Sequence, residues 1–105
     1  MNVSYSAAAR QSGKDFLLLE QATTTLKEVI TEFAEHVKIE WDRTEDATGS
    51  ALFTLHLSDD TGAVAADFTP DELQAPRHVR IRLHQLWGDL LRIKSHRLLE
   101  AMGRE

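Results

Sequence analysis

The sequence contains no cysteine, and this absence excludes several kinds of chemistry at once. Without thiols there is no disulfide framework, no thiolate nucleophile and no zinc site of the cysteine type. Long apolar runs are also missing, since no stretch of about 18 residues is apolar enough for a transmembrane helix. Residues 1–15 lack the basic start and the apolar core of a signal peptide, because the alanines at 7–9 are followed at once by Arg10. We therefore expect a cytoplasmic protein.

Glycine is scarce, and no glycine belongs to a phosphate-binding loop. Gly49, Gly62, Gly88 and Gly103 each stand alone in the chain, so no Gly-rich loop can cradle a nucleotide. The serines are not accompanied by the G-x-S-x-G pattern of a nucleophile elbow. We therefore expect a protein that is not an enzyme and that needs no cofactor.

The residues that could bind a metal or act as acids and bases are dispersed. No two histidines have the i, i+4 spacing of a helical metal site; the five are His36, His56, His78, His84 and His96. The acidic residues at 42–46 and 59–60 fall where hairpin tips are expected. A hydrolytic pair of carboxylates needs a cleft, which a hairpin tip does not provide. The sequence therefore predicts neither a metal site nor a catalytic pair.

Residues 15–35 show an apolar repeat at steps of three and four, which is typical of an amphipathic helix. The repeat consists of Leu19, Ala22, Leu26, Val29 and Phe33, with Ile30 beside it. We expect one helix from about Asp15 to Glu35. The threonines at 23–25 are unfavourable inside a helix because β-branched side chains lose rotamer freedom there. The alternative is a strand at 16–20, followed by a helix capped at Thr25.

Three later segments alternate between apolar and polar residues, as half-buried strands do. They are HVKIEWDR, ALFTLHLS and AVAADF, which begin at residues 36, 51 and 63. The side chains expected to point inward are Val37, Ile39, Trp41, Phe53, Leu55, Leu57, Val64, Ala66 and Phe68. A polar loop follows the first strand, and the turn at 59–62 follows the second. Three strands joined in this way form an antiparallel meander.

The last third of the chain predicts two helical pieces. Thr69 and Glu72 fit the capping box of a helix start. Pro76 lacks a backbone N–H and clashes with the preceding turn, so a helix cannot continue through it. We expect a short helical turn at 70–75 and a main helix from about Pro76 to Met102.

This main helix is unusually long and unusually apolar. One stripe contains Val79, Leu83, Leu86, Leu90 and Ile93, and beside it lie Trp87, Leu91, Leu98 and Met102. Together they cover about half of the helix, more than the ~100° needed to dock on one sheet. The helix would be about 39 Å long, whereas a domain of this size has a radius of gyration near 13 Å. We therefore expect it to overhang the body and to form a homodimer or bind a partner helix. The expected interface residues are Trp87, Leu91, Leu98 and Met102, with Arg80 and Arg97 at the edge.

Charge is distributed unevenly along this acidic chain, whose net charge is −5 and whose pI is about 5.5. Residues 1–76 hold 5 Lys/Arg against 14 Asp/Glu, a net charge of −9. Residues 77–105 hold 7 Lys/Arg against 3 Asp/Glu, a net charge of +4. One interpretation is that the basic helix packs among the acidic parts of its own fold. The other is that it presents its charge to an acidic partner.

The expected architecture is an α+β fold of order α-β-β-β-α, with two helices on one face of a three-stranded antiparallel sheet. Residues 15–105 would form one domain, preceded by a flexible segment at 1–14; a short edge strand at 2–6 is the alternative. We expect a non-catalytic protein–protein interaction domain with a regulatory, adaptor or chaperone-like role.

The same element order resembles that of the double-stranded-RNA-binding domain and the related ribosome-hibernation factors. This resemblance implies RNA or ribosome binding through basic residues on one surface. Here the basic residues are Arg77, Arg80, Arg82, Arg92, Lys94 and Arg97. The small, acidic, dimer-prone character is also similar to that of secretion chaperones.

Overall fold

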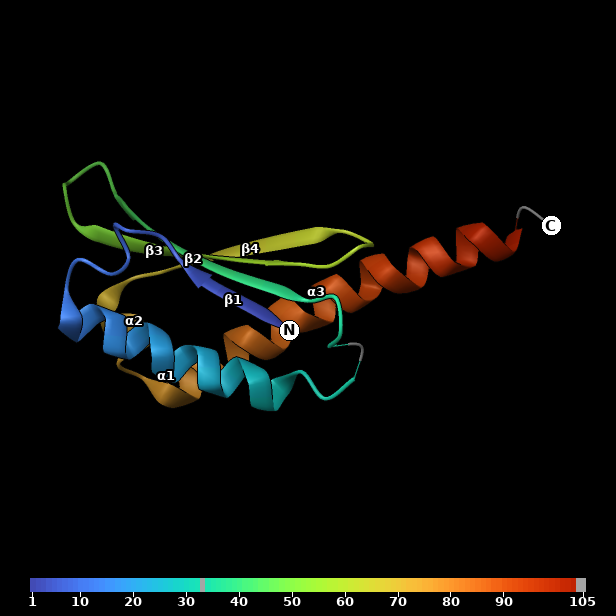
Figure 1. Cartoon of the computed structure of the whole chain (residues 1–105), viewed down its shortest axis with the longest axis horizontal. Helices are drawn as coiled ribbons and strands as arrows, with labels where there is room; N and C mark the ends of the chain where they lie inside the picture. Colours follow the sequence, from blue (N-terminus) through green and yellow to red (C-terminus); the bar gives the residue numbers. More distant parts are fainter. Residues whose placement is uncertain (33, 104–105) are drawn as a thin grey trace.

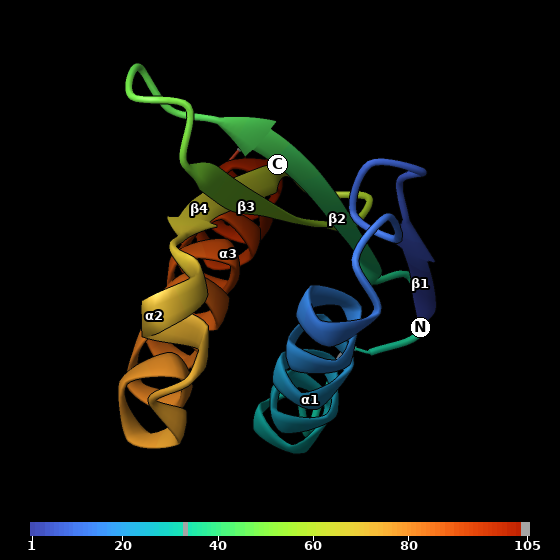
Figure 2. The same ribbon diagram turned by 90° about the vertical axis from the view of Figure 1, so that its left-hand side faces the viewer.

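A four-stranded sheet with helices on one face forms the body of the protein (Figures 1 and 2). The computed structural model describes residues 1–32 and 34–103. Its elements are β1 (Asn2–Tyr5), α1 (Gly13–Val29), β2 (Lys38–Glu45), β3 (Ala51–Ser58), β4 (Ala63–Phe68), α2 (Pro70–Leu73) and α3 (Pro76–Gly103). The α+β class is therefore confirmed.

The sheet differs from the expected three-stranded meander because it has a fourth, parallel strand. Its order is β1-β2-β3-β4, and β1 pairs with β2 in parallel, with Asn2 opposite Lys38 and Tyr5 opposite Trp41. The expected flexible segment thus contains an edge strand, which was the alternative interpretation. Side chains hold it there: the Tyr5 hydroxyl donates to Thr23 Oγ1 on α1, and Ser6 Oγ donates to Asp42. A parallel pair needs a long crossover connection, and α1 provides it.

The two hairpins follow the expected pattern. β3 and β4 have the expected bounds, and both β2–β3 and β3–β4 are antiparallel. The inward residues Ile39 and Trp41 of β2 and Phe53, Leu55 and Leu57 of β3 are fully buried, whereas Glu40 and His56 are exposed on the uncovered face. On β4, Phe68 is buried while Val64 and Ala66 are half-buried. The covered face of the sheet thus receives both long helices.

Helix α1 begins and ends earlier than expected. Ser12 caps its start by accepting the Asp15 N–H. Its end is at Val29 rather than Glu35, because the buried Ile30 adopts an extended backbone (φ −82°, ψ 96°) and starts the connection to β2. Val29, Ile30 and Thr31 form a β-branched run, which favours this exit. Phe33, the last residue of the expected apolar repeat, lies outside the described residues.

The three consecutive threonines are accommodated within α1, so the alternative of a strand at 16–20 is wrong. Thr23, Thr24 and Thr25 each donate their hydroxyl to the carbonyl four residues earlier. Such a bond satisfies the hydroxyl within the helix, because it shares the carbonyl that accepts the backbone N–H of the same threonine. Thr23 has a further role, because its buried Oγ1 also accepts the indole N–H of Trp41 at 2.9 Å.

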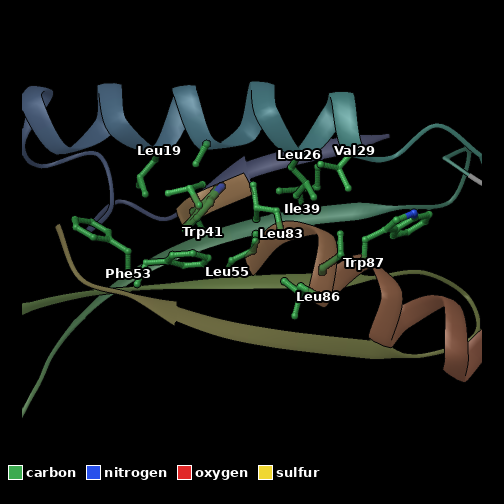
Figure 3. Packing of buried hydrophobic residues seen from close by; sticks show 14 of the residues in the cluster. Leu19, Leu26, Val29, Ile39, Trp41, Phe53, Leu55, Leu83, Leu86 and Trp87 are labelled. Atoms are coloured by element: carbon green, nitrogen blue, oxygen red, sulfur yellow. The ribbon is translucent and has the colours of Figure 1, made fainter. Parts of the chain in front are cut away.

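The core lies between α1, α3 and the covered face of the sheet (Figure 3). Trp41, Leu55 and Leu83 are almost completely buried at its centre. The expected short turn and proline break are confirmed as α2 and the start of α3 at Pro76. α3 has 28 residues, about 42 Å at 1.5 Å per residue. Its C-terminal part extends past the sheet (Figure 1).

Candidate interaction surface

Helix α3 has a docked part and an uncovered end. The docked part contributes Val79, Leu83, Leu86, Trp87 and Leu90 to the core. Beyond Lys94 every described residue is exposed. We call residues 95–103 the overhang. Three large apolar side chains lie on it, with exposed fractions of 58% for Leu98, 66% for Leu99 and 71% for Met102. They fall within about 100° of one another around the helix axis, so they form one patch.

The structure places the residues expected at the interface in different environments. Leu98 and Met102 are on the overhang, with Arg97 near them. Trp87 is 7% exposed and packs in the core of its own chain, while Leu91 is half-buried against that core. Arg80 binds Glu28 of α1 at 2.5 Å, so it joins the two helices. Leu99 was not among the expected interface residues, although 98, 99 and 102 are all apolar in the last turns of the helix.

The six basic residues proposed for RNA binding are mostly engaged with the protein's own acids. Arg80 pairs with Glu28, Arg82 with Glu72, Arg92 with Asp89 and Lys94 with Asp59. Arg77 and Arg97 make no ion pair within the described part of the chain. This arrangement supports the interpretation that the basic helix neutralises acidic neighbours in the fold, although exposed pairs of this kind contribute little stability individually.

Arg82 is held most firmly of these cations. Its guanidinium lies over the Phe68 ring, 4.2 Å from the centroid, and donates to the Asp67 carbonyl oxygen at 2.6 Å. It also donates to Glu72, whose other hydrogen bonds form the capping box with Thr69. Burial raises the pKa of Glu72. Hydrogen bonds from Thr69 and His78 and the charge of Arg82 lower it by more than burial raises it, so the pKa of Glu72 lies below its ordinary value. Arg82 thus joins α3, α2 and the end of β4.

The β3–β4 turn meets α3 where the overhang begins. The Asp59 side chain is 1% exposed, and its Oδ1 accepts hydrogen bonds from Thr61 and Gly62. Its Oδ2 lies 3.8 Å from Lys94 Nζ. Gly62 packs so tightly that a Cβ atom there would lie 2.7 Å from Ile93 Cγ2. The turn therefore clamps α3 at its last covered residues.

The Asp59 carboxylate gives this clamp a dependence on pH. Burial raises its pKa, but hydrogen bonds from Thr61, the charge of Lys94 and a bond from Gly62 outweigh burial, so the pKa lies below its ordinary value of 3.8. A depressed pKa means that the charged form stabilises the folded state. This contribution is present above the unfolded pKa and is lost as the pH falls through the folded pKa.

Asp59→Asn is expected to lower the free energy of unfolding at pH 7 by about 1–3 kcal/mol, because hydrogen bonds to a charged acceptor are weakened. Urea unfolding between pH 7 and pH 3 measures the effect. The difference in the free energy of unfolding between the variant and the wild type should shrink below pH 4, as Asp59 becomes protonated. Asp60→Asn, at the exposed neighbour, is the control and should have little effect. A difference that is constant with pH would contradict this role of the carboxylate.

The five histidines all lie in the described part of the chain. Within residues 1–32 and 34–103, no three His, Asp or Glu residues gather as a metal site. His56 lies opposite Glu40 on the uncovered face, whereas His36 precedes β2. No helix in the described ranges is long and apolar enough to span a bilayer. A groove of about 460 Å³ does lie between β4 and α3.

Comparisons of the chain with protein-family models, curated proteins and solved structures find no match. The overhang of α3 carries three of the six large apolar side chains that are exposed in the described part of the chain.

Proposed function

We propose that this protein is a non-catalytic interaction protein that forms a homodimer through the overhang of α3. The observation that carries the proposal is the exposure of Leu98, Leu99 and Met102 on a helical end that the body leaves uncovered. A contiguous apolar patch of this kind is typical of a protein–protein contact. A regulatory, adaptor or chaperone-like role, with a further protein partner, is consistent with such a dimer.

A second copy of the chain fits this patch well. Leu91, Ser95, Leu98 and Met102 have the alternating three- and four-residue spacing of a helix–helix seam, and three of these four residues are apolar. When two such helices run antiparallel about a two-fold axis between 96 and 97, Leu91 faces Met102 of the other copy. A two-fold contact buries the same patch on both copies. The overhang therefore supplies its own complement.

Charge neither drives nor opposes this arrangement. Residues 95–105 hold Arg97 and Arg104 against Glu100 and Glu105, so this end of the chain has no net charge. The net charge of +4 lies on residues 77–94, where most of the basic side chains already pair with the protein's own acids. The overhang is only about 13 Å long, so the contact is smaller than a standard interface. We therefore expect the dimer to have a dissociation constant on the order of micromolar.

Leu98→Asp tests the proposal by sedimentation equilibrium over a range of concentrations. The wild type should reach twice its mass of 11.9 kDa, whereas Leu98→Asp should remain a monomer with an unchanged circular dichroism spectrum. Ile81→Asp is the matched control, because Ile81 is 58% exposed on the docked part of the same helix, and it should still dimerise. A wild type that is monomeric at all concentrations, or a Leu98→Asp variant that dimerises equally well, would refute the homodimer.

The alternative of RNA or ribosome binding has less support, because four of its six basic residues are paired with carboxylates. Binding of the purified protein to RNA, with an affinity that falls steeply as salt is raised, would favour that alternative.

A further inference from the structure

Strand β4 forms one edge of the sheet, and its backbone shows which residues face outward. The Asp59 N–H donates to the Gly62 carbonyl and closes the turn, so these two residues form a hydrogen-bonded pair. In an antiparallel ladder such pairs alternate with non-bonded ones. Ala63, Ala65 and Asp67 therefore direct their N–H and C=O groups away from β3. The bond from Arg82 to the Asp67 carbonyl agrees with this direction.

A groove lies beside this edge, between β4 and α3. Its volume is about 460 Å³, and its lining residues are Ala65, Ala66, Asp67, Arg82, Gln85, Leu86 and Asp89. The small side chains of Ala65 and Ala66 leave the strand side of the groove open. Leu86, which is 5% exposed, lies at the base of the groove. Arg82 closes one end through its bond to Asp67. Unpaired strand groups above an apolar base are the features that bind an extended peptide.

The charges of the groove favour a basic occupant. Asp67 and Asp89 both line it. The single cation, Arg82, is already offset by Glu72 at 2.8 Å. Asp89 also pairs with Arg92, but the side chains are 49% and 79% exposed, and an ion pair in contact with solvent contributes little energy. A lysine or arginine entering the groove would therefore meet a net negative surface.

We propose that the β4 groove binds an extended segment of a partner protein that carries a lysine or arginine, added as a further strand beside β4. Main-chain hydrogen bonds to Ala63 and Ala65 would hold the segment, about 4.8 Å from β4. Its basic side chain would lie against Asp89. This surface is separate from the overhang and does not depend on dimer formation.

The probe is a blocked heptapeptide of alternating valine and lysine, titrated into isotope-labelled protein and followed by the amide NMR signals. The titration uses both the wild type and the monomeric Leu98→Asp variant, so that its result is independent of the overhang. The expected result is saturable shifts at residues 63–68 and along the facing part of α3. The valine–glutamate peptide, and a valine–lysine peptide with alternate amides N-methylated, should each bind at least tenfold more weakly.

Variants test the two contacts separately. Ala65→Pro removes an N–H that faces away from β3, a position where an edge strand accepts proline, and should weaken binding at least tenfold. Asp89→Lys should weaken it similarly, whereas Glu40→Lys, the same charge change on the uncovered sheet face, should not. If Ala65→Pro fails to fold, the N-methylated peptide still tests the main-chain bonds.

Three outcomes would overturn the proposal. The first is the absence of shifts at β4. The second is equal binding by wild type, Ala65→Pro and Asp89→Lys. The third is a concentration-dependent shift of the β4 signals of the Leu98→Asp variant without peptide, which would assign the groove to a second copy of this chain.

Discussion

Leu83→Ala is expected to lower the free energy of unfolding by about 2–5 kcal/mol, whereas Leu98→Ala should change it by less than about 0.5 kcal/mol. Both residues are leucines on α3, so helix propensity and side-chain chemistry are matched. They differ in environment: Leu83 has no exposed surface, and Leu98 is 58% exposed. Removing Leu83 leaves a cavity between α1 and the sheet, whereas Leu98 has no such packing within the monomer.

Urea unfolding at nanomolar protein concentration measures this contrast, because any dimer is then dissociated. The stability of the wild type itself should rise with protein concentration, since a dimer couples folding to mass action. Leu98→Ala should weaken this concentration dependence, and Leu83→Ala should not. Equal losses of monomer stability for the two variants would show that the overhang packs against its own body.

Thr23→Val is expected to lower the free energy of unfolding by about 2–3 kcal/mol, despite a nearly unchanged side-chain volume. The hydroxyl of Thr23 accepts the Trp41 indole N–H at 2.9 Å and the Tyr5 hydroxyl at 3.1 Å. Trp41 is 1% exposed, so its N–H would be left without a partner in the core. A buried unsatisfied donor costs about 1–3 kcal/mol. The hydroxyl thus joins β1, β2 and α1 at one atom.

Thr23→Ser is the control, because it keeps the hydroxyl and loses only a methyl group, at a cost near 1 kcal/mol. Thermal unfolding of both variants makes the comparison. A double-mutant cycle with Tyr5→Phe isolates the bond to β1: Tyr5→Phe should be destabilising in the wild type and nearly neutral with valine at 23. A Thr23→Val protein as stable as the wild type would contradict this assignment.

Local signals in the sequence predicted the elements that depend on neighbours in the chain. The alternation in β3 and β4, the capping box at Thr69 and the proline at 76 all act within a few residues, and each element has its expected start. The strand β1 was only the alternative to a flexible segment. Its four residues are too few to show a clear apolar–polar alternation, and its partner β2 lies far along the chain. Helix α1 ends where Ile30 adopts an extended backbone and packs in the core. The apolar repeat of the helix does not mark this position.

The candidate surface was predicted in part for a related reason. A helical wheel shows that α3 is apolar over a wide arc, but it does not show how far the body covers the helix. That limit is set by the β3–β4 turn, where Gly62 meets Ile93 and Asp59 meets Lys94. Trp87 falls before this limit and packs in the core, whereas Leu98 and Met102 fall beyond it. The same turn also pairs one of the basic residues, because Asp59 lies beside Lys94.

The parallel pairing of β1 with β2 also leads us to expect a particular order of folding. Ser6 and Asp42, which bond at the end of this pair, are 36 positions apart, whereas the strands of the two hairpins are joined by short turns. Closing the longer loop costs more chain entropy, and non-local pairings of this kind form slowly. During synthesis β1 emerges before β2, so it waits unpaired while α1 and β2 are made. We therefore expect the edge of the sheet formed by β1 to be completed after the two hairpins.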